Sequence, residues 1–134
     1  QCERLHGHNY QLAVRVVGDI DAQGMVLDFR FVKNQLRQLV EGWDHRVLLP
    51  ARSSRIKVTS KGDRTKVVTP NGTYSFPTAD VKVLDIVETT AEELARLVCQ
   101  LLTAALKAKL PTLKLVAVSV AESSRQWATV ASNL

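Results

Sequence analysis

The sequence has few cysteines and few aromatic residues, and each shortage argues against a class of protein. Two cysteines, Cys2 and Cys99, in 134 residues are too few for the disulfide framework of a small secreted domain. We therefore expect a reducing compartment, the cytoplasm. Aromatic residues make up only 5% of the chain, which leaves few rings for stacking on nucleic-acid bases. No apolar run approaches the roughly 20 residues of a membrane helix, so no membrane partner is expected.

The chain also lacks an initial methionine and a leader. It begins at Gln1, and no charged stretch followed by an apolar run indicates a signal peptide. This start suggests a trimmed chain. With 46% hydrophobic and 23% charged residues, the composition is typical of a globular protein, and we expect one domain over residues 1–134.

Acidic residues are scarce in one segment. From Ala51 to Thr73, six basic residues stand against the single acid Asp63, so this segment carries the whole net charge of +5. Such a segment can meet an anion such as phosphate or RNA, although a solvated hairpin face is the commoner reason for a charge run. The segment contains no aromatic residue for base stacking, so nucleic acid is not an expected partner. A salt-dependent RNA affinity that disappears on neutralising Lys57, Lys61 and Lys66 would favour the RNA alternative.

Hydrophobic periodicity predicts strands and helices in the order β-α-(inserted β)-α-β-β, which is an α+β fold. Apolar residues alternate over residues 9–19, as in a strand, and recur at helical spacing over 28–40, with Asp28 as N-cap. Further strands are expected at residues 56–59, 65–69, 73–76, 81–87, 113–122 and 125–131. The segment at about 52–77 thus forms an inserted basic β-hairpin with an added strand.

The strongest local signal is the helix that begins after Thr90. Thr90 as N-cap and Glu93 three residues later predict a capping box. An apolar stripe follows, and Pro111 ends the helix. Cys99 lies beside this stripe, so we interpret it as a packing residue.

Two histidines stand at the head of the first strand, in the order His6-Gly7-His8. Residues two apart on a strand face the same side, so both imidazoles point one way, roughly 6–7 Å apart. This geometry suits a transition metal, most often zinc, although two surface histidines at a strand edge fit the pattern as well. Cys2 lies four residues before His6, where a metal site would favour its thiolate, a competent base or nucleophile. A small packing residue is the alternative for Cys2.

Two carboxylates are further candidates. Asp44, next to His45, can bias the tautomer of the imidazole and raise its basicity, which suits a proton shuttle, although the dipeptide is common. Glu122 ends an apolar strand, on the face of Val118 and Val120. A carboxylate there is solvated, paired, or used to hold the N–H groups of a ligand.

Five ordered motifs resemble the 6-pyruvoyl tetrahydropterin synthase family over nearly the whole chain. They are Cys2-x-x-x-His6-Gly7-His8-Asn9-Tyr10, Gly24-Met25-Val26-Leu27-Asp28-Phe29, Trp43-Asp44-His45, Thr90-Ala91-Glu92-Glu93-Leu94-Ala95 and Val118-Ser119-Val120-Ala121-Glu122. The three residues between Cys2 and His6 are similar to the spacing in the bacterial and archaeal 6-carboxy-5,6,7,8-tetrahydropterin synthases, whereas the animal enzymes keep a longer gap. Leu5 stands where the folate-pathway branch has a glutamate.

This resemblance implies a tunnelling fold, an antiparallel sheet with two helices between its strand pairs. Subunits of this fold assemble into barrels of trimers, usually stacked as a homohexamer. The resemblance also implies a zinc-dependent lyase that converts 7,8-dihydroneopterin triphosphate into 6-carboxytetrahydropterin, acetaldehyde and triphosphate, on the route to queuosine-type nucleosides. A 6-pyruvoyl tetrahydropterin synthase or a related dihydroneopterin-cleaving enzyme is the alternative within the family, and a non-catalytic RNA-binding module is the alternative outside it.

The resemblance further assigns the metal and catalytic residues. His6 and His8 are implied to be zinc ligands, and Cys2 the catalytic base. Asp44 and His45 are implied to be its relay partners. The family's third zinc ligand is a histidine on a strand before Cys2, so we expect that an N-terminal strand is missing from this sequence.

Substrate binding is implied for three other residues. Glu122 resembles the family's pterin anchor, and Thr90 and Glu92 resemble supporting pocket residues from a neighbouring subunit. The insertion at about 52–77 is a departure, because most family members are shorter here. It could line the triphosphate route or decorate the barrel edge.

Overall fold

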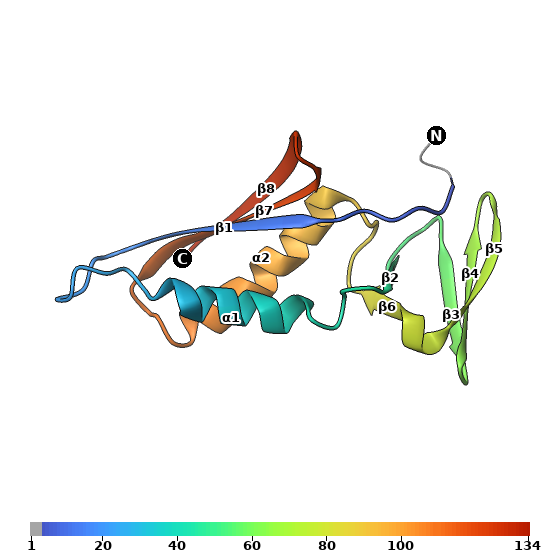
Figure 1. Ribbon diagram of the computed structural model, residues 1–134, viewed down its shortest axis with the longest axis horizontal. Coiled ribbons are helices and arrows are strands. Elements are labelled where there is room, and N and C mark those ends of the chain that lie inside the picture. Colours follow the sequence, from blue (N-terminus) through green and yellow to red (C-terminus); the bar gives the residue numbers. More distant parts are fainter. Residues whose placement is uncertain (1–3) are drawn as a thin grey trace.

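The computed structural model describes residues 4–134 and shows two adjoining regions along the long axis of the molecule (Figure 1). The helix-backed region contains β1 (Gln11–Gly18), α1 (Phe29–Val40), α2 (Ala91–Lys107), β7 (Leu113–Ser123) and β8 (Gln126–Asn133). The strand region contains β2 (Val47–Pro50), β3 (Lys57–Lys61), β4 (Arg64–Thr69), β5 (Gly72–Pro77), the short helix η1 (Thr78–Asp80) and β6 (Val81–Leu84). The order of elements confirms the predicted α+β pattern.

In the helix-backed region, β1, β7 and β8 form an antiparallel sheet in the order β1-β7-β8. Val118 of β7 pairs with Val14 on one side and with Val130 on the other. Because side chains alternate along a strand, Val116, Val118 and Val120 share one face, and all three are completely buried. Both helices lie on this face (Figure 1), so the sheet is backed on one side only.

Both predicted helices are confirmed, and their first turns explain where they begin. The Asp28 carboxylate accepts a hydrogen bond from the Arg30 backbone N–H at 2.8 Å, and this bond holds the pKa of Asp28 below its ordinary value. Thr90 Oγ1 accepts from the Glu93 N–H at 3.2 Å. Cys99 is buried and its thiol donates to the Val116 carbonyl oxygen, so its predicted packing role is also confirmed. No helix in residues 4–134 is long and apolar enough to cross a membrane.

The strand region departs from the sequence expectation in two ways. Strand β2 was not predicted, and it pairs in parallel with β6. Strand β6 ends at Leu84 rather than at residue 87. Strands β3, β4 and β5 form one antiparallel sheet, which confirms the predicted hairpin with its added strand. Gly62, in the turn between β3 and β4, has a φ of +60°, a conformation that glycine adopts without strain.

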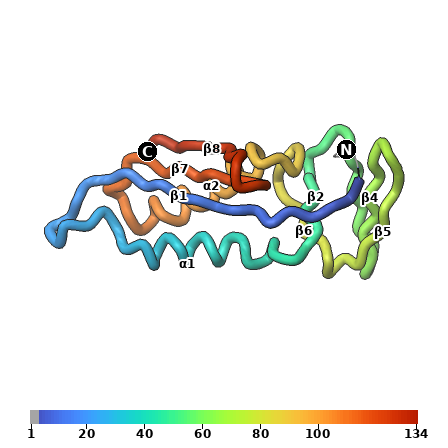
Figure 2. The backbone as a smooth tube through the Cα atoms, turned by 45° about the horizontal axis from the view of Figure 1, so that its top comes forward, coloured from blue at the N-terminus to red at the C-terminus, as the bar shows by residue number. Residues whose placement is uncertain are grey.

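Each region has its own apolar core. The large core lies between α1, α2 and the β1-β7-β8 sheet, and it also takes in Leu84 at the end of β6 and Ile86 in the linker that follows. The small core lies between the β2–β6 pair and the inner face of the β3–β5 sheet, around Leu49, Val67 and Val81. Figure 2 shows the segment before β1 running from the helix-backed region toward the strand region. This segment carries the predicted metal ligands between the two regions.

Candidate functional site

The two histidines of the predicted metal site lie together on the segment before β1. The ring centroids of His6 and His8 are 4.7 Å apart, and both side chains are exposed. His6 Nδ1 lies 2.7 Å from the Arg4 carbonyl oxygen. When the Nδ1–H donates a hydrogen bond to that carbonyl, Nε2 keeps the lone pair that a metal ion needs. The donor set of the pair therefore fits zinc.

Tyr10 continues this row toward Glu122. The rings of His8 and Tyr10 have centroids 5.8 Å apart. Since Gln11 pairs with Ala121, the next rung of the ladder brings Tyr10 beside Glu122. Burial raises the pKa of the Tyr10 phenol, and the negative charge of Glu122 raises it further, so the phenol is neutral at physiological pH.

Glu122 itself is exposed at the end of β7, where the β7–β8 register shifts between Ala121 and Ser123. The structure thus gathers the predicted metal ligands and the predicted pterin anchor along one strip. Sequence reasoning included Tyr10 in a motif but gave it no role. The period of two that links His6, His8 and Tyr10 was the signal that could have found it.

Asp44 and His45 form the expected pair directly after α1. Asp44 Oδ1 lies 2.9 Å from His45 Nδ1, and the two side chains are 78% and 92% exposed. His45 has a φ of 56°, an uncommon left-handed conformation for a residue other than glycine. Within residues 4–134, no hydrogen bond, ion pair or ring contact joins this pair to His6 or His8. The single chain therefore does not bring the relay pair to the histidines.

Thr90 and Glu92 lie in the first turn of α2. Thr90 is the N-cap, as predicted, and Glu92 is exposed in the turn. The predicted capping box is only half right. The Glu93 carboxylate does not reach back to the Thr90 N–H but accepts from the Val87 N–H at 3.0 Å.

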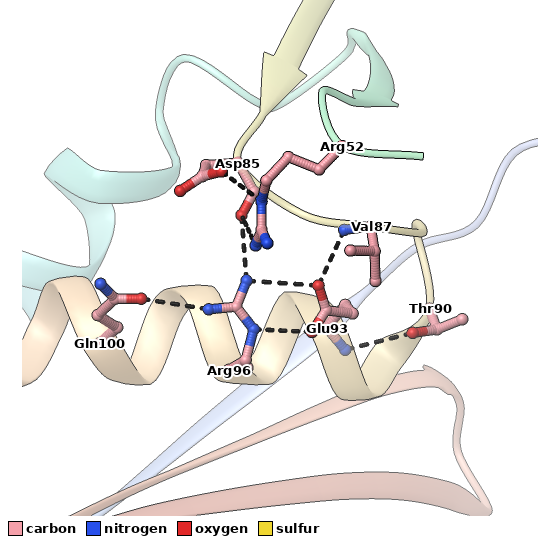
Figure 3. A network of polar contacts seen from close by, with 7 residues as sticks. All are labelled: Arg52, Asp85, Val87, Thr90, Glu93, Arg96 and Gln100. Atoms are coloured by element: carbon pink, nitrogen blue, oxygen red, sulfur yellow. Dashed lines mark hydrogen bonds and ion pairs between the residues drawn. The ribbon is translucent and has the colours of Figure 1, made fainter. Parts of the chain in front are cut away.

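A polar network fixes the loop that carries these residues (Figure 3). Arg96 Nε donates to Glu93 Oε1 at 2.7 Å, and Arg96 Nη2 donates to the Asp85 carbonyl oxygen at 3.0 Å. The bonds from Arg96 and from the Val87 N–H hold the pKa of Glu93 below its ordinary value, and the same pairing raises the pKa of Arg96. Arg52 joins the network through the Asp85 carboxylate at 2.7 Å. The loop before α2 is thereby tied both to the helix and to the strand region.

A cavity of about 310 Å³ lies between the segment before β1, strand β2 and the inserted sheet. Arg4 and Leu5, which directly precede His6, line one part of it. Glu88 and Thr89, which directly precede Thr90, line another. The inserted segment contributes Arg55, so two guanidinium groups border a space that also has apolar walls, including Tyr74 and Phe76. The cavity can take a flat apolar group together with an anion.

The described residues supply only part of a metal site. In residues 4–134, no cluster of three or more His, Cys, Asp or Glu side chains is arranged to hold a metal ion. His6 and His8 are two ligands, whereas catalytic zinc sites use three from the protein. Cys2, the predicted base, lies outside the described residues, and its role stays a prediction.

Comparison with known proteins identifies close structural relatives. The profile of the family described as 6-pyruvoyl tetrahydropterin synthase matches residues 1–133. The 6-pyruvoyltetrahydropterin synthase of Plasmodium vivax superposes with a TM-score of 0.92 at 31% identity, over 98% of this chain and 83% of that one. The Plasmodium falciparum enzyme gives a TM-score of 0.89 at 29% identity. These similarities confirm the tunnelling fold.

Curated relatives carry a related name. A protein of Methanocaldococcus jannaschii, provisionally assigned as a 6-carboxy-5,6,7,8-tetrahydropterin synthase, is 30% identical over 95 residues, which is 70% of this chain and 58% of the relative. The 6-carboxy-5,6,7,8-tetrahydropterin synthase of Aquifex aeolicus is 46% identical over 50 residues, which is 37% of this chain and 31% of the relative. The match therefore spans little more than half the length of the first relative.

Proposed function

Because the chain belongs to the 6-pyruvoyl tetrahydropterin synthase family, we propose that it is a zinc-dependent carbon-carbon lyase acting on 7,8-dihydroneopterin triphosphate. The products would be 6-carboxytetrahydropterin, acetaldehyde and triphosphate. This reaction would be a step of queuosine biosynthesis. The names of the curated relatives favour this reaction over the 6-pyruvoyl alternative. The observation that carries the proposal is the strip on which His6, His8 and Tyr10 lead to Glu122. It offers metal ligands and a carboxylate anchor to one substrate.

His6 and His8 would hold the zinc as two of the three protein ligands that a catalytic zinc site uses. Bound zinc supplies a Lewis acid that acidifies the hydroxyl groups of the substrate side chain. The Arg4 carbonyl oxygen accepts a hydrogen bond from the His6 Nδ1–H and so holds the ring in the tautomer that ligates through Nε2. This hydrogen bond orients the His6 ring for metal binding before a metal ion arrives.

Proton transfer is assigned to Cys2, Asp44 and His45. Cys2 would remove the proton from the substrate side chain. The Asp44 carboxylate accepts a hydrogen bond from the His45 Nδ1–H, which leaves the lone pair of His45 Nε2 able to take up a proton and then to deliver it. Since this pair is exposed in the single chain, we propose that it exchanges protons with substrate bound at His6 and His8 of a neighbouring subunit.

Glu122 would anchor the pterin by accepting hydrogen bonds from the ring N–H and amino groups. Thr90 and Glu92 would support the ring from the neighbouring subunit. Arg4 and Arg55 border the cavity beside the site and offer cations for the triphosphate. This gives the insertion a part in substrate binding.

The proposal makes the chain one subunit of a cytoplasmic homohexamer. Helices cover one face of the β1-β7-β8 sheet, and the opposite face exposes 43% of Val17 and 45% of Trp127. Large apolar side chains on an uncovered sheet face favour contact with further copies. Sedimentation of the purified protein measures the size of the assembly.

Product analysis tests the reaction. The zinc-loaded protein is incubated with 7,8-dihydroneopterin triphosphate, and the products are identified by mass spectrometry. We expect 6-carboxytetrahydropterin and acetaldehyde. A 6-pyruvoyl product would move the protein to the alternative reaction, and no turnover by the folded, zinc-loaded protein would remove the proposal.

Three variants separate the assigned roles. His6→Ala with His8→Ala should lose stoichiometric zinc in elemental analysis. Cys2→Ala should keep zinc and fold but lose about 10²–10⁴-fold in turnover, the contribution of a general base. Glu122→Gln should bind a pterin analogue roughly ten- to a hundredfold more weakly at an unchanged melting temperature, because a donor replaces one acceptor oxygen. Wild-type behaviour of any variant would cancel that residue's role.

A further inference from the structure

The β3–β4–β5 sheet has one face on the small core and one face in solvent. The registers place Thr59 opposite Lys66 and Lys61 opposite Arg64. They also place Lys66 opposite Ser75. We call the solvent side the cationic face. Its residues are all exposed: Lys57, Thr59, Lys61, Arg64, Lys66, Val68, Thr73, Ser75 and Pro77.

The cationic face carries four basic side chains and no carboxylate. Within residues 4–134, Lys57, Lys61 and Lys66 take part in no ion pair. Lys61 and Arg64 lie directly opposite each other, and like charges in that position destabilise an antiparallel pair. An anion over the face would relieve this repulsion. The positive charge of this face therefore does not stabilise the fold, and binding of an anion explains it better.

Hydrogen-bond donors accompany the charges. Arg64 lies across β5, with Nη2 donating to the Ser75 carbonyl oxygen at 2.9 Å and Nε donating to Ser75 Oγ at 3.2 Å. In the described part of the chain, Nη1 of Arg64 has no hydrogen-bond partner. The hydroxyls of Thr59 and Thr73 are exposed beside it. Lysine, arginine and hydroxyl side chains are the groups that contact the phosphates of nucleic acids.

Aromatic rings are absent from this face because the alternation of the strand turns them inward. Tyr74 and Phe76 stack with centroids 6.0 Å apart on the other side of the sheet, where they pack against the small core. The face therefore has nothing on which unpaired bases could stack. It also offers Val68 as its one large apolar side chain, too little to insert into a lipid bilayer.

We propose that the cationic face binds the phosphate backbone of a base-paired nucleic acid without reading its sequence. Lys61 lies four residue steps after Lys57 in an extended strand, a span of about 13 Å. Duplex phosphates are much more closely spaced along the helix axis, about one charge per 1.7 Å, so all four cations can reach one duplex. From the sequence, nucleic acid was not expected as a partner because the segment has no aromatic rings for stacking on bases. Contact with the phosphate backbone of a duplex needs no such rings. This property is independent of the pterin reaction.

The salt dependence of binding tests the proposal. The probe is a fluorescein-labelled DNA duplex of about 16 base pairs, and its binding is followed by fluorescence anisotropy between about 50 and 200 mM salt. Four phosphate contacts predict a slope of log K against log salt near −3.6, and a loss of affinity of about 10²-fold over that range. The variant Lys57→Gln, Lys61→Gln, Lys66→Gln should retain a slope of about −1. Lys66→Gln alone should reduce the slope by about 0.9 and disturbs the fold least.

A matched control removes the same charge elsewhere. Lys33→Gln, Arg37→Gln, Lys107→Gln changes three exposed cations on the two helices and should keep the wild-type slope. Equal losses in both triple variants would overturn the proposal, because net charge alone would then explain binding. Binding to phosphatidylserine vesicles without binding to the duplex would overturn it as well. An affinity that changes between two unrelated duplex sequences would contradict backbone recognition.

Discussion

The helix-backed region and the strand region differ in what holds them together. In the described part of the chain, the large core has fourteen buried residues and the small core three. The strand region compensates with polar links. Thr65 is completely buried, and its hydroxyl lies 2.9 Å from Ser60 Oγ and 3.0 Å from Thr78 Oγ1. A region with little apolar burial depends more on each hydrogen bond for its stability.

The largest expected effect comes from the same substitution made in each core. Leu102→Ala removes a completely buried side chain of the large core, and we expect it to lower the free energy of unfolding by about 4–5 kcal/mol. Leu49→Ala, in the small core, should cost about 2–3 kcal/mol because the sheet above it can settle into the space. Urea unfolding measures both. Equal losses would show that the two cores are packed alike.

A smaller effect is expected where the two regions are joined. Glu93→Gln weakens the bonds to Val87 and Arg96 and should lower the free energy of unfolding by about 1–2 kcal/mol. Because the pKa of Glu93 is lower in the folded state than in the unfolded chain, the stabilisation is present above the unfolded value and is lost as pH falls through the folded one. Melting temperatures of the wild type and the variant should differ at neutral pH and converge at acid pH, where the Glu93 carboxylate is protonated in the folded state as well.

Glu92→Gln is the control for this measurement. Glu92 lies in the same first turn but is exposed, so its effect should stay within the few tenths to about 1 kcal/mol of a helix-dipole interaction. A pH dependence as large for Glu92→Gln as for Glu93→Gln would assign the effect to the helix dipole rather than to the network.

The smallest expected effect concerns the hydroxyl chain of the strand region. Thr65→Val keeps the shape of the side chain but leaves the hydroxyls of Ser60 and Thr78 one partner short, at a cost of about 1 kcal/mol. Thr59→Val, on the exposed face of the same sheet, should change stability by less than about 0.5 kcal/mol. Thermal unfolding distinguishes them, and equal values would mean that the buried hydroxyl contributes nothing.

Local signals predicted the helices because their information lies within a few turns. Asp28 and Thr90 act as N-caps in the structure, as their sequence positions indicated. Strand β2 escaped prediction because Val47–Pro50 is a four-residue apolar run that ends in proline and has no alternation. Its conformation is fixed by parallel pairing with β6, a contact between residues far apart in sequence. Such a pairing leaves no local pattern.

The candidate site was predictable to a similar degree. The spacing of His6 and His8 predicted that their side chains point the same way, and their rings do lie together. The adjacent Asp44 and His45 form the ion pair that their positions suggested. The place of Tyr10 between the histidines and the carboxylate depends on the β1–β7 register, which the sequence does not state. The Glu93 partner was misassigned because the path of the loop before α2, which brings the Val87 N–H within reach, is a tertiary feature.

The bond from the Val87 N–H to Glu93 has a consequence for how the protein moves. The linker from β6 to α2 shares its hydrogen bonds with the first turn of the helix, so the two open as one cooperative unit. The Val87 amide proton should therefore exchange with solvent only as often as that turn unravels. Glu88 and Thr89, which lie between Val87 and Thr90 in this linker, line the neighbouring cavity. A ligand that settles against them meets a preorganised surface and loses little affinity to ordering the chain.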